Sequence, residues 1–313
     1  MADLADMFGG GETARFLGLP AAELTALEAD LVIYGADCAT PYPSVGAYCA
    51  GGPAAIRAGG AAYSGDLTKV NFDLLGPVLP ATVRAVDAGD LPVEPADAAG
   101  NRAAIAGATR QILAAGAVPV LLGGDDSLPI PLIEALGDSG EPLTILQIDA
   151  HIDWRESVEG EPLGLSSTMR RASEMAHVER IIQVGARGVG SAGMTELQAA
   201  RDWGVHLIPA HQFTDPLAVA ALVPEGARVA ICFDCDALDP AIMPAVIAPT
   251  AGGLSYAQVL ELIRAVAARA RIASFDMVEF MPPQDRDGLG ARTAAQLLAS
   301  VIGLIGGQKA ARR

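Results

Sequence analysis

Short apolar runs recur along the chain, each bounded by turn-forming residues, and they predict strands that are buried on both faces of a sheet. Stretches with apolar residues at helical spacing lie between several of these runs. Alternating strands and helices predict an α/β fold with a parallel sheet covered on both sides. The strands are expected at residues 31–34, 118–122, 143–148, 181–184, 206–208, 229–233 and 272–275.

Helix-start signals support two of the predicted helices. Asn101 is the expected N-cap of an Ala-rich helix. Ser255 and Gln258 have the spacing of a capping box, in which each side chain accepts a bond from the backbone N–H of the other residue. The helices are expected at residues 101–115, 128–136, 255–271 and 294–305.

The length of 313 residues suits one large α/β domain. The alternation of strands and helices runs through the chain without a long linker or a strong internal repeat. We therefore expect a single domain over residues 1–313. The Gly- and Pro-rich residues 41–60 are expected to form a surface loop at the rim of an active site.

Three potential metal ligands follow the strand predicted at residues 143–148. Asp149, His151 and Asp153 occupy alternate positions, and residues i, i+2 and i+4 of an extended chain point to one side. These side chains are expected to face one site at the carboxyl end of the strand, where open α/β sheets place their ligands.

A second strand end carries the same pattern. Asp234 and Asp236 follow the strand predicted at residues 229–233. Four carboxylates that converge without a cation would repel one another and would be costly to desolvate. One or two divalent metal ions would remove that cost, so the two strand ends together predict a metal centre.

Composition narrows the choice of partners. The formal net charge of −16 argues against binding to nucleic acid or to an anionic membrane surface. The first six residues show neither the basic region nor the apolar core of a signal peptide. No uninterrupted apolar run reaches about 18 residues. A cytoplasmic protein without a membrane span is therefore expected.

The four cysteines, Cys38, Cys49, Cys232 and Cys235, do not form a dense disulfide framework. Cys232 and Cys235 match a Cys-x-x-Cys pattern, but residues i and i+3 of a strand face opposite sides. Ordinary core cysteines are expected. A zinc-binding or redox module built on this pair is the alternative, and it predicts zinc that is lost when either cysteine is replaced.

The two ligand-bearing stretches and several other short blocks resemble the ureohydrolase family, which includes arginases and agmatinases. The N-terminal block and the Gly-Pro-x-x-Ile-Arg-like block are similar to the agmatinase-like branch. The blocks occur in the expected order and span nearly the whole chain. They are residues 16–20, 51–57, 149–153, 233–240, 252–255 and 276–283.

The resemblance implies an arginase-like, three-layer α/β/α fold with a parallel eight-stranded sheet. It also implies a binuclear metal centre, usually manganese and in some members nickel. Two such ions activate a water molecule near neutral pH, which attacks the guanidinium carbon and releases urea and an amine. The implied partner is a small guanidino compound. The implied assembly is a trimer or hexamer, either a homo-oligomer or one with a homologous partner chain.

Matched residue by residue, the resemblance implies that Asp149 and Asp234 bridge both metal ions. His151 and Asp236 would complete the ligand shell of one ion. Asp153 would bind the other ion, and its free oxygen would help to move a proton.

Glu279 follows the strand predicted at residues 272–275 and resembles the carboxylate that anchors the guanidinium of the substrate. This role is physically reasonable, because a carboxylate accepts two parallel N–H bonds from a guanidinium group. A solvated loop residue is the alternative.

One departure from the family pattern affects a metal ligand. Residues 123–127 read Gly-Gly-Asp-Asp-Ser where the family has Gly-Gly-Asp-His-Ser, so Asp126 replaces a His ligand. Asp126 is expected to bind metal and to favour manganese, because oxygen ligands prefer harder ions. The alternatives are a weak or empty metal site, or a role for Asp125 and Asp126 in capping the next helix.

A second departure affects proton transfer. Leu165 stands where many relatives carry a His that is credited with proton shuttling or substrate contact. The other histidines, His177, His206 and His211, have no motif that makes one of them a replacement, and each is expected to be structural. An alternative therefore stays open, in which the chain is a non-catalytic or weakly metal-binding subunit of a hetero-oligomer with an active partner. The retained site residues favour an enzyme.

Trp154 and Arg155 begin the loop after the first ligand triplet and are candidates for substrate contact. Trp154 is expected to stack on a flat guanidinium group. Arg155 would disfavour a cationic tail such as that of agmatine and would pair with a carboxylate tail. A surface salt bridge from Arg155 to Glu156 or Glu159 is the alternative. Agmatine, a guanidino acid and an alkylguanidine are all retained as substrates.

Overall fold

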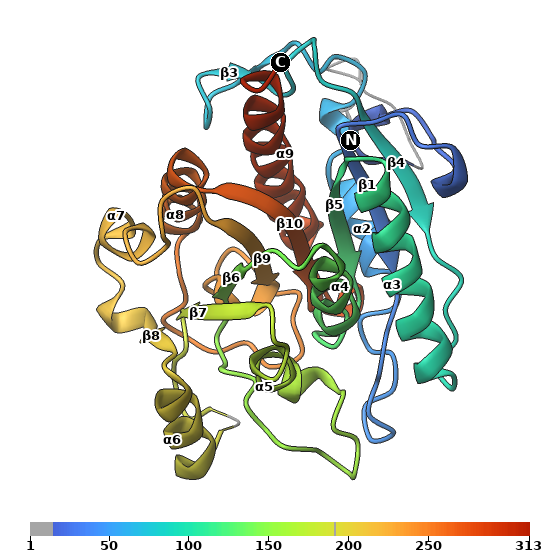
Figure 1. The fold of residues 1–313 in the computed structure, drawn as a ribbon. Helices are drawn as coiled ribbons and strands as arrows, with labels where there is room; N and C mark the ends of the chain where they lie inside the picture. The colour runs from blue at the N-terminus through green and yellow to red at the C-terminus, as the bar shows by residue number, and fades with distance from the viewer. Residues whose placement is uncertain (1–14, 191) are drawn as a thin grey trace.

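Eight strands form the central sheet of the computed structural model, which describes residues 15–190 and 192–313 (Figure 1). They are β1 (Leu31–Ala36), β4 (Ala85–Asp90), β5 (Val118–Gly123), β6 (Leu143–Ile148), β7 (Val178–Val184), β8 (His206–Ile208), β9 (Arg228–Asp234) and β10 (Arg271–Val278). Their order is β4-β1-β5-β10-β9-β6-β7-β8, and every pairing in this sheet is parallel. The predicted α/β fold is confirmed.

The edge strand β4 was missing from the sequence prediction. Its six residues, Ala-Val-Asp-Ala-Gly-Asp, alternate between buried and less buried positions instead of forming an apolar run. β4 lies at the edge of the sheet, where β1 is its one neighbouring strand and an isolated bridge joins Asp87 to Ala21 on the other side. The described chain also holds a short antiparallel hairpin of β2 (Val70–Asn71) and β3 (Gly76–Pro77).

Helices cover both faces of the sheet and give three layers (Figure 1). Successive residues of a strand point to opposite faces, so Leu31 and Ile33 of β1 pack in one layer and Val32 and Tyr34 in the other. One layer contains α2 (Gly52–Gly59), α7 (Pro216–Ala220), α8 (Tyr256–Arg269) and α9 (Leu289–Ala310). The other contains α3 (Ala98–Ala114), α4 (Pro129–Leu136), α5 (Thr168–Ser173) and α6 (Met194–Trp203).

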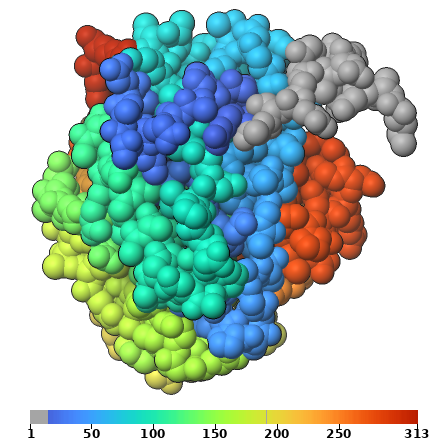
Figure 2. Space-filling model, turned by 90° about the vertical axis from the view of Figure 1, so that its right-hand side faces the viewer, coloured from blue at the N-terminus to red at the C-terminus, as the bar shows by residue number. Residues whose placement is uncertain are grey.

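The prediction that residues 41–60 form a loop was wrong for the second half of that stretch, which is α2. Pro53 lies in the first turn of α2, where a missing N–H does no harm. Gly59 allows a close approach to α9, because a Cβ there would lie 2.2 Å from the carbonyl oxygen of Ala291. Figure 2 shows a mid-blue stretch of the chain lying between the teal region and the orange-red C-terminal segment.

One of the two predicted helix starts is confirmed. Ser255 and Gln258 form the expected capping box at the start of α8. The N-cap of α3 is Asp97, whose side chain accepts a bond from the N–H of Gly100 at 2.9 Å. Asn101 therefore lies inside the helix, and its buried amide bonds loop carbonyl groups instead.

The last helix, α9, is long and apolar enough to cross a membrane by length and composition alone. However, 67% of the most apolar 18-residue stretch of α9 is buried inside the protein. The core helix of a globular protein can have the same length and apolar composition. The expectation that the chain does not span a membrane stays a prediction. The first six residues, on which the signal-peptide prediction rests, lie outside the described residues.

All four cysteines are free and buried, as predicted. Cys232 packs in the core cluster beneath α5 and α6, whereas Cys235 packs in the cluster beneath α8 and α9. The two thiols thus lie on opposite sides of the sheet. This arrangement does not support a zinc-binding or redox module built on the pair.

A buried ion pair ties α2 to the edge strand β4. The guanidinium group of Arg57 bonds the carboxylate of Asp87 at 2.8 and 3.1 Å, and both residues are nearly inaccessible to solvent. Asp87 also accepts the backbone N–H groups of Phe16 and Gly89. The pair therefore joins three segments that are distant in sequence.

Breaking a buried pair leaves an uncompensated charge, so Arg57→Ala is expected to lower the free energy of unfolding by about 3–5 kcal/mol. Chemical denaturation followed by circular dichroism would measure this loss. The matched control is Arg110→Ala, which breaks an exposed pair with Asp138 and is expected to cost less than about 1 kcal/mol. Equal effects of the two substitutions would contradict the prediction.

Candidate metal centre

The carboxyl ends of four adjacent strands bring the predicted site residues together. The strands β5, β10, β9 and β6 are neighbours in the sheet, and their register places Ile148 beside Phe233 and Val278 beside Asp234. Residues at these strand ends therefore meet at one edge of the sheet. They are Asp126 after β5, Glu279 after β10, Asp234 and Asp236 at the end of β9, and Asp149, His151 and Asp153 after β6.

Two overlapping groups of side chains have the spacing to hold metal ions. Asp149, His151 and Asp236 offer ligand atoms within 4.8 Å of one another, and so do Asp126, Asp149 and Asp153. In the first group, Nδ1 of His151 lies 3.1 Å from Asp236 and 3.4 Å from Asp149. Asp149 belongs to both groups, which is the position that a bridging ligand needs.

Asp234 adds a further carboxylate to this cluster. Its Oδ1 accepts a bond from the N–H of Asp236 at 2.6 Å, and its side chain is buried. Burial, followed by the charges of Asp236 and Asp149, raises the pKa of Asp234. Burial and neighbouring carboxylates raise the pKa values of Asp126 and Asp153 in the same way. The cluster therefore has an excess of negative charge that its positively charged groups do not balance.

His151 offsets part of this negative charge. Burial disfavours the charged form of His151, but its bonds to Asp149 and Asp236 outweigh burial and raise its pKa to about 12. Burial would raise the pKa of Asp149, but the bonds with His151 lower it to about 2. A bound dication would take over this balancing role from the protonated imidazole.

The donor set fits two divalent ions. The Oδ2 atom of Asp126 is buried and has no hydrogen-bond partner, which is costly unless a cation lies nearby. Carboxylate oxygens with a single imidazole suit manganese better than softer metals. The residues that would hold the ions are those predicted from the sequence: Asp126, Asp149, His151, Asp153, Asp234 and Asp236.

The neighbouring Asp125 has a different role. Its carboxylate accepts the N–H of Ser127 at 3.1 Å and the N–H of Ala39 at 3.3 Å. Asp125 therefore stabilises the turn before α4. It does not cap the helix, because the N-cap of α4 is Leu128, which has no side-chain cap bond. Asp126 makes no such bond through Oδ2 and belongs to a metal-spaced group instead.

Replacing Asp126 tests its role as a ligand. Asp126→Ala is expected to reduce the bound metal from about two ions per chain to about one, because it removes a ligand of only one group. Asp126→His restores a ligand atom and is expected to keep both ions. Elemental analysis of the purified proteins measures the difference. An alanine variant that keeps both ions would show that Asp126 is not a ligand.

Two buried glutamines that the sequence analysis missed support the ligands after β6. Nε2 of Gln147 donates to Asp149 at 2.6 Å and to Asp153 at 2.5 Å. Gln183 in turn donates to Oε1 of Gln147 at 2.5 Å and to the carbonyl oxygen of Ile152 at 2.8 Å. Buried polar groups need hydrogen-bond partners. A glutamine inside an apolar strand therefore indicates a polar partner nearby, and this signal was available in the sequence.

Two of the predicted site residues have strained backbones. Asp153 has φ 42° and Glu279 has φ 64°, in the left-handed region that non-glycine residues rarely adopt. Such strain persists only where the surrounding structure fixes it, and it is concentrated at functional sites. The backbone N–H of Glu279 donates to the carbonyl oxygen of Gly124 at 2.8 Å, which fixes one of these conformations.

Glu279 is 4% exposed, so the alternative of a solvated loop residue is wrong. The hydroxyl of Tyr48 lies 2.6 Å from Oε1 and 2.7 Å from Oε2 of Glu279, and the N–H of Asp126 lies 2.8 Å from Oε1. Burial raises the pKa of Glu279 to about 8, although the bond from Tyr48 opposes this shift. Tyr48 comes from residues 41–50, and no pattern in that stretch predicted its contact with Glu279.

Comparison with known proteins agrees with this arrangement. The match to the family described as "Arginase family" extends over residues 29–303. The chain belongs to the arginase family. The predicted ureohydrolase resemblance and the enzyme class, a metal-dependent hydrolase of amidine C–N bonds, are thereby confirmed.

Relatives of this arginase-family chain include enzymes with different names. Guanidinopropionase of Pseudomonas aeruginosa is 34% identical over 233 residues, which cover 71% of this chain and 72% of the relative. Agmatinase of Bacillus anthracis is 30% identical over 282 residues, which cover 88% of this chain and 91% of the relative. The structure of proclavaminate amidino hydrolase from Streptomyces clavuligerus has the same fold, with a TM-score of 0.81, 24% identity and coverage of 95% and 98%.

The structure does not support the predicted stacking of Trp154 on the substrate. Trp154 is 2% exposed and packs edge-on against Trp203, with ring centroids 6.2 Å apart. The Arg155 side chain is half-buried. Glu156, one of its proposed partners, pairs with Arg170. A contact between Arg155 and the substrate stays a prediction.

Leu165, at the position of the usual His, begins a short 3-10 turn. Among the histidines, His177 bonds a carbonyl oxygen of α4 at 3.0 Å, and His206 contacts Arg180 at 2.7 Å. These contacts agree with the predicted structural roles. His211 differs, because it lines a cavity next to the metal centre.

That cavity, of about 800 Å³, extends from His151 to residues 186–190 and 192–194. None of the described residues that line it is an aspartate or a glutamate. Arg187 lies in its wall but directs its guanidinium at the carbonyl oxygens of Asp236 and Thr250, at 2.7 and 2.8 Å. The space next to the metal centre is therefore mostly apolar.

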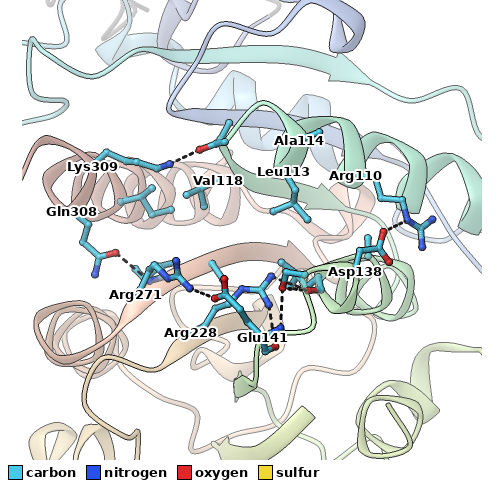
Figure 3. A pocket seen from close by; sticks show the side chains of 18 of the residues that line it. Arg110, Leu113, Ala114, Val118, Asp138, Glu141, Arg228, Arg271, Gln308 and Lys309 are labelled. Atoms are coloured by element: carbon cyan, nitrogen blue, oxygen red, sulfur yellow. Dashed lines mark hydrogen bonds and ion pairs between the residues drawn. The ribbon is translucent and has the colours of Figure 1, made fainter. Parts of the chain in front are cut away.

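A second cavity, of about 580 Å³, lies at the opposite edge of the sheet, where β5, β9 and β10 begin (Figure 3). Basic side chains line it, but they serve structural roles. Arg228 donates to the carbonyl oxygen of Leu136 at the end of α4, and Arg271 pairs with Glu141. Helix C-termini carry unpaired carbonyl groups and partial negative charge, which accounts for cations at this edge.

Proposed function

We propose that this arginase-family chain hydrolyses a small guanidino compound to urea and an amine. The observation that carries the proposal is the pair of overlapping ligand groups that share Asp149, with the buried carboxylate of Glu279 beside them. Metal-spaced ligands and a carboxylate that can receive a guanidinium group are the two parts that this reaction needs.

Two divalent ions, when bound by these ligands, supply Lewis-acid activation of the attacking water near neutral pH. Manganese is the proposed metal, because five of the six ligands are carboxylates. Nickel is the alternative. A homotrimer or homohexamer in the cytoplasm is proposed from the resemblance to the family.

The chain's own residues position the substrate and move a proton. Glu279 accepts two N–H bonds from the guanidinium and thereby fixes the orientation of its central carbon. Asp153 accepts the proton that is released during attack and passes it to the leaving amine. Gln147 keeps the carboxylate of Asp153 in place for this transfer. Asp153 then takes on the proton transfer that the absent His would otherwise perform.

The tail of the substrate is proposed to be neutral or negatively charged. A cationic tail, such as the amine of agmatine, would find no carboxylate among the described residues that line the neighbouring cavity. Burying an unpaired charge is costly. The half-buried Arg155 would favour a carboxylate tail further. A guanidino acid or an alkylguanidine is therefore preferred over agmatine.

The test is a urea assay combined with elemental analysis of protein expressed with manganese or with nickel. The panel is 4-guanidinobutanoate, butylguanidine and agmatine, which differ in the charge of the tail at similar length. We expect about two metal ions per chain and a higher kcat/KM for the first two compounds. Well-folded protein without metal or urea release would favour the non-catalytic subunit of a hetero-oligomer.

A further inference from the structure

Tyr48 places a single hydroxyl group between the two oxygens of Glu279. The distances of 2.6 and 2.7 Å to Oε1 and Oε2 are nearly equal. A donor that is equidistant from both oxygens lies on the open side of the carboxylate. A guanidinium group approaches from that same side when it donates two parallel N–H bonds.

Glu279 has no other free pair of acceptor sites for a guanidinium group. An ionised carboxylate has about four acceptor sites, two on each oxygen. Oε1 already accepts from Tyr48 and from the N–H of Asp126 at 2.8 Å, and Oε2 accepts from Tyr48 and lies 3.9 Å from the thiol of Cys49. Parallel binding of a guanidinium therefore requires the Tyr48 hydroxyl to leave.

We propose that Tyr48 is an internal competitor for the guanidinium site, which the substrate displaces from Glu279 when it binds. This inference rests on the proposed function, because it takes Glu279 as the guanidinium anchor. The contact stabilises the empty carboxylate and lowers its apparent affinity for every guanidinium ligand. Tyr48 therefore sets KM and takes no part in the chemical step.

The surroundings of Tyr48 allow its side chain to leave. Tyr48 is intermediate in burial as a residue, whereas the adjacent Cys49 is fully buried and anchors the backbone. Gly46 and Gly51 flank this segment with φ 62° and 80°, and a Cβ at either would meet nothing within 4 Å. Tyr48 belongs to none of the three clusters of buried core residues, so displacement of its side chain removes no contact within them.

The experiment compares Tyr48→Phe with the unmodified full-length, metal-loaded chain. Calorimetric titration with methylguanidine measures affinity, and a urea assay of the cell contents afterwards separates binding heat from turnover. We expect Tyr48→Phe to lower the Kd by about tenfold, since it removes a hydrogen bond to a charged group. With a panel substrate that releases urea, KM is expected to fall by a similar factor while kcat is unchanged.

The matched control is Tyr42→Phe. Tyr42 lies in the same loop, but its hydroxyl accepts a bond from the N–H of Ser166 at 3.1 Å and does not contact Glu279. Its removal is expected to leave the Kd for methylguanidine unchanged. Thermal unfolding of each variant verifies that the fold is intact.

Unchanged or weaker binding by Tyr48→Phe would overturn the proposal, and so would a fall in kcat, which would make Tyr48 a substrate contact or a proton donor. The double variant Tyr48→Phe/Glu279→Gln separates the two hypotheses. If it loses methylguanidine binding while Tyr48→Phe shows no gain, only the competition is wrong. Tyr48→Phe could bind methylguanidine more tightly while neither it nor the unmodified chain releases urea from any compound. The competition would then stand and the proposed reaction would fail.

Discussion

Asp149→Asn is expected to remove metal from both positions of the arginase-family centre and to lower urea release on the order of a thousandfold. Asp149 is the residue that both ligand groups share, so its loss weakens both at once. An asparagine has similar size and keeps one oxygen, but it lacks the charge that a bridging ligand contributes. The substitution therefore tests the charge of the side chain more than its shape.

Elemental analysis and the urea assay measure the two effects in the same preparation. Asp138→Asn is the matched control, because Asp138 is an exposed aspartate at the opposite edge of the sheet, paired with Arg110. It is expected to keep full metal content and activity. An Asp149→Asn variant with about two ions per chain would show that Asp149 is not the shared ligand.

Glu279→Gln is expected to separate metal binding from substrate binding. The variant should retain both ions, because Glu279 belongs to neither ligand group. Its urea release should fall by about a hundredfold or more, since truncation of one partner of a buried charged pair typically costs 2–5 kcal/mol or more. The neutral amide keeps the size of the side chain but replaces one acceptor oxygen with a donor.

A urea assay with saturating metal, together with the metal content, distinguishes this outcome from general damage to the site. Loss of metal along with activity would place Glu279 in the metal centre and would refute its role as a separate guanidinium anchor. Activity within a factor of a few of the unmodified chain would refute any contact with the reacting group.

The strand ends and the clustering of the candidate ligands there could be predicted because the information is local. Alternation along an extended chain places Asp149, His151 and Asp153 on one side, and a buried apolar run identifies the preceding strand. Trp154 follows these residues directly, but the structure buries it in the core. Its assignment to the substrate followed its position next to the ligands and overlooked the direction of its side chain.

Other features depend on contacts between distant segments and leave little trace in the sequence. Tyr48 reaches Glu279 across 231 positions, and only the folded sheet edge brings them together. The edge strand β4 and the short helix α2 carry weak patterns, because one lies at the edge of the sheet and the other packs through glycine. Tertiary contacts fix both elements.

The left-handed backbone at Asp153 and Glu279 has a consequence for protein engineering. Glycine adopts this conformation without steric penalty, so glycine at either position would relieve backbone strain. Replacement of a converging carboxylate would also relieve repulsion in the metal-free chain. A library selected for heat resistance alone would therefore enrich variants that have lost the site. Selection for stability in this scaffold needs a simultaneous requirement for turnover, because the residues proposed to act are also those that destabilise the fold.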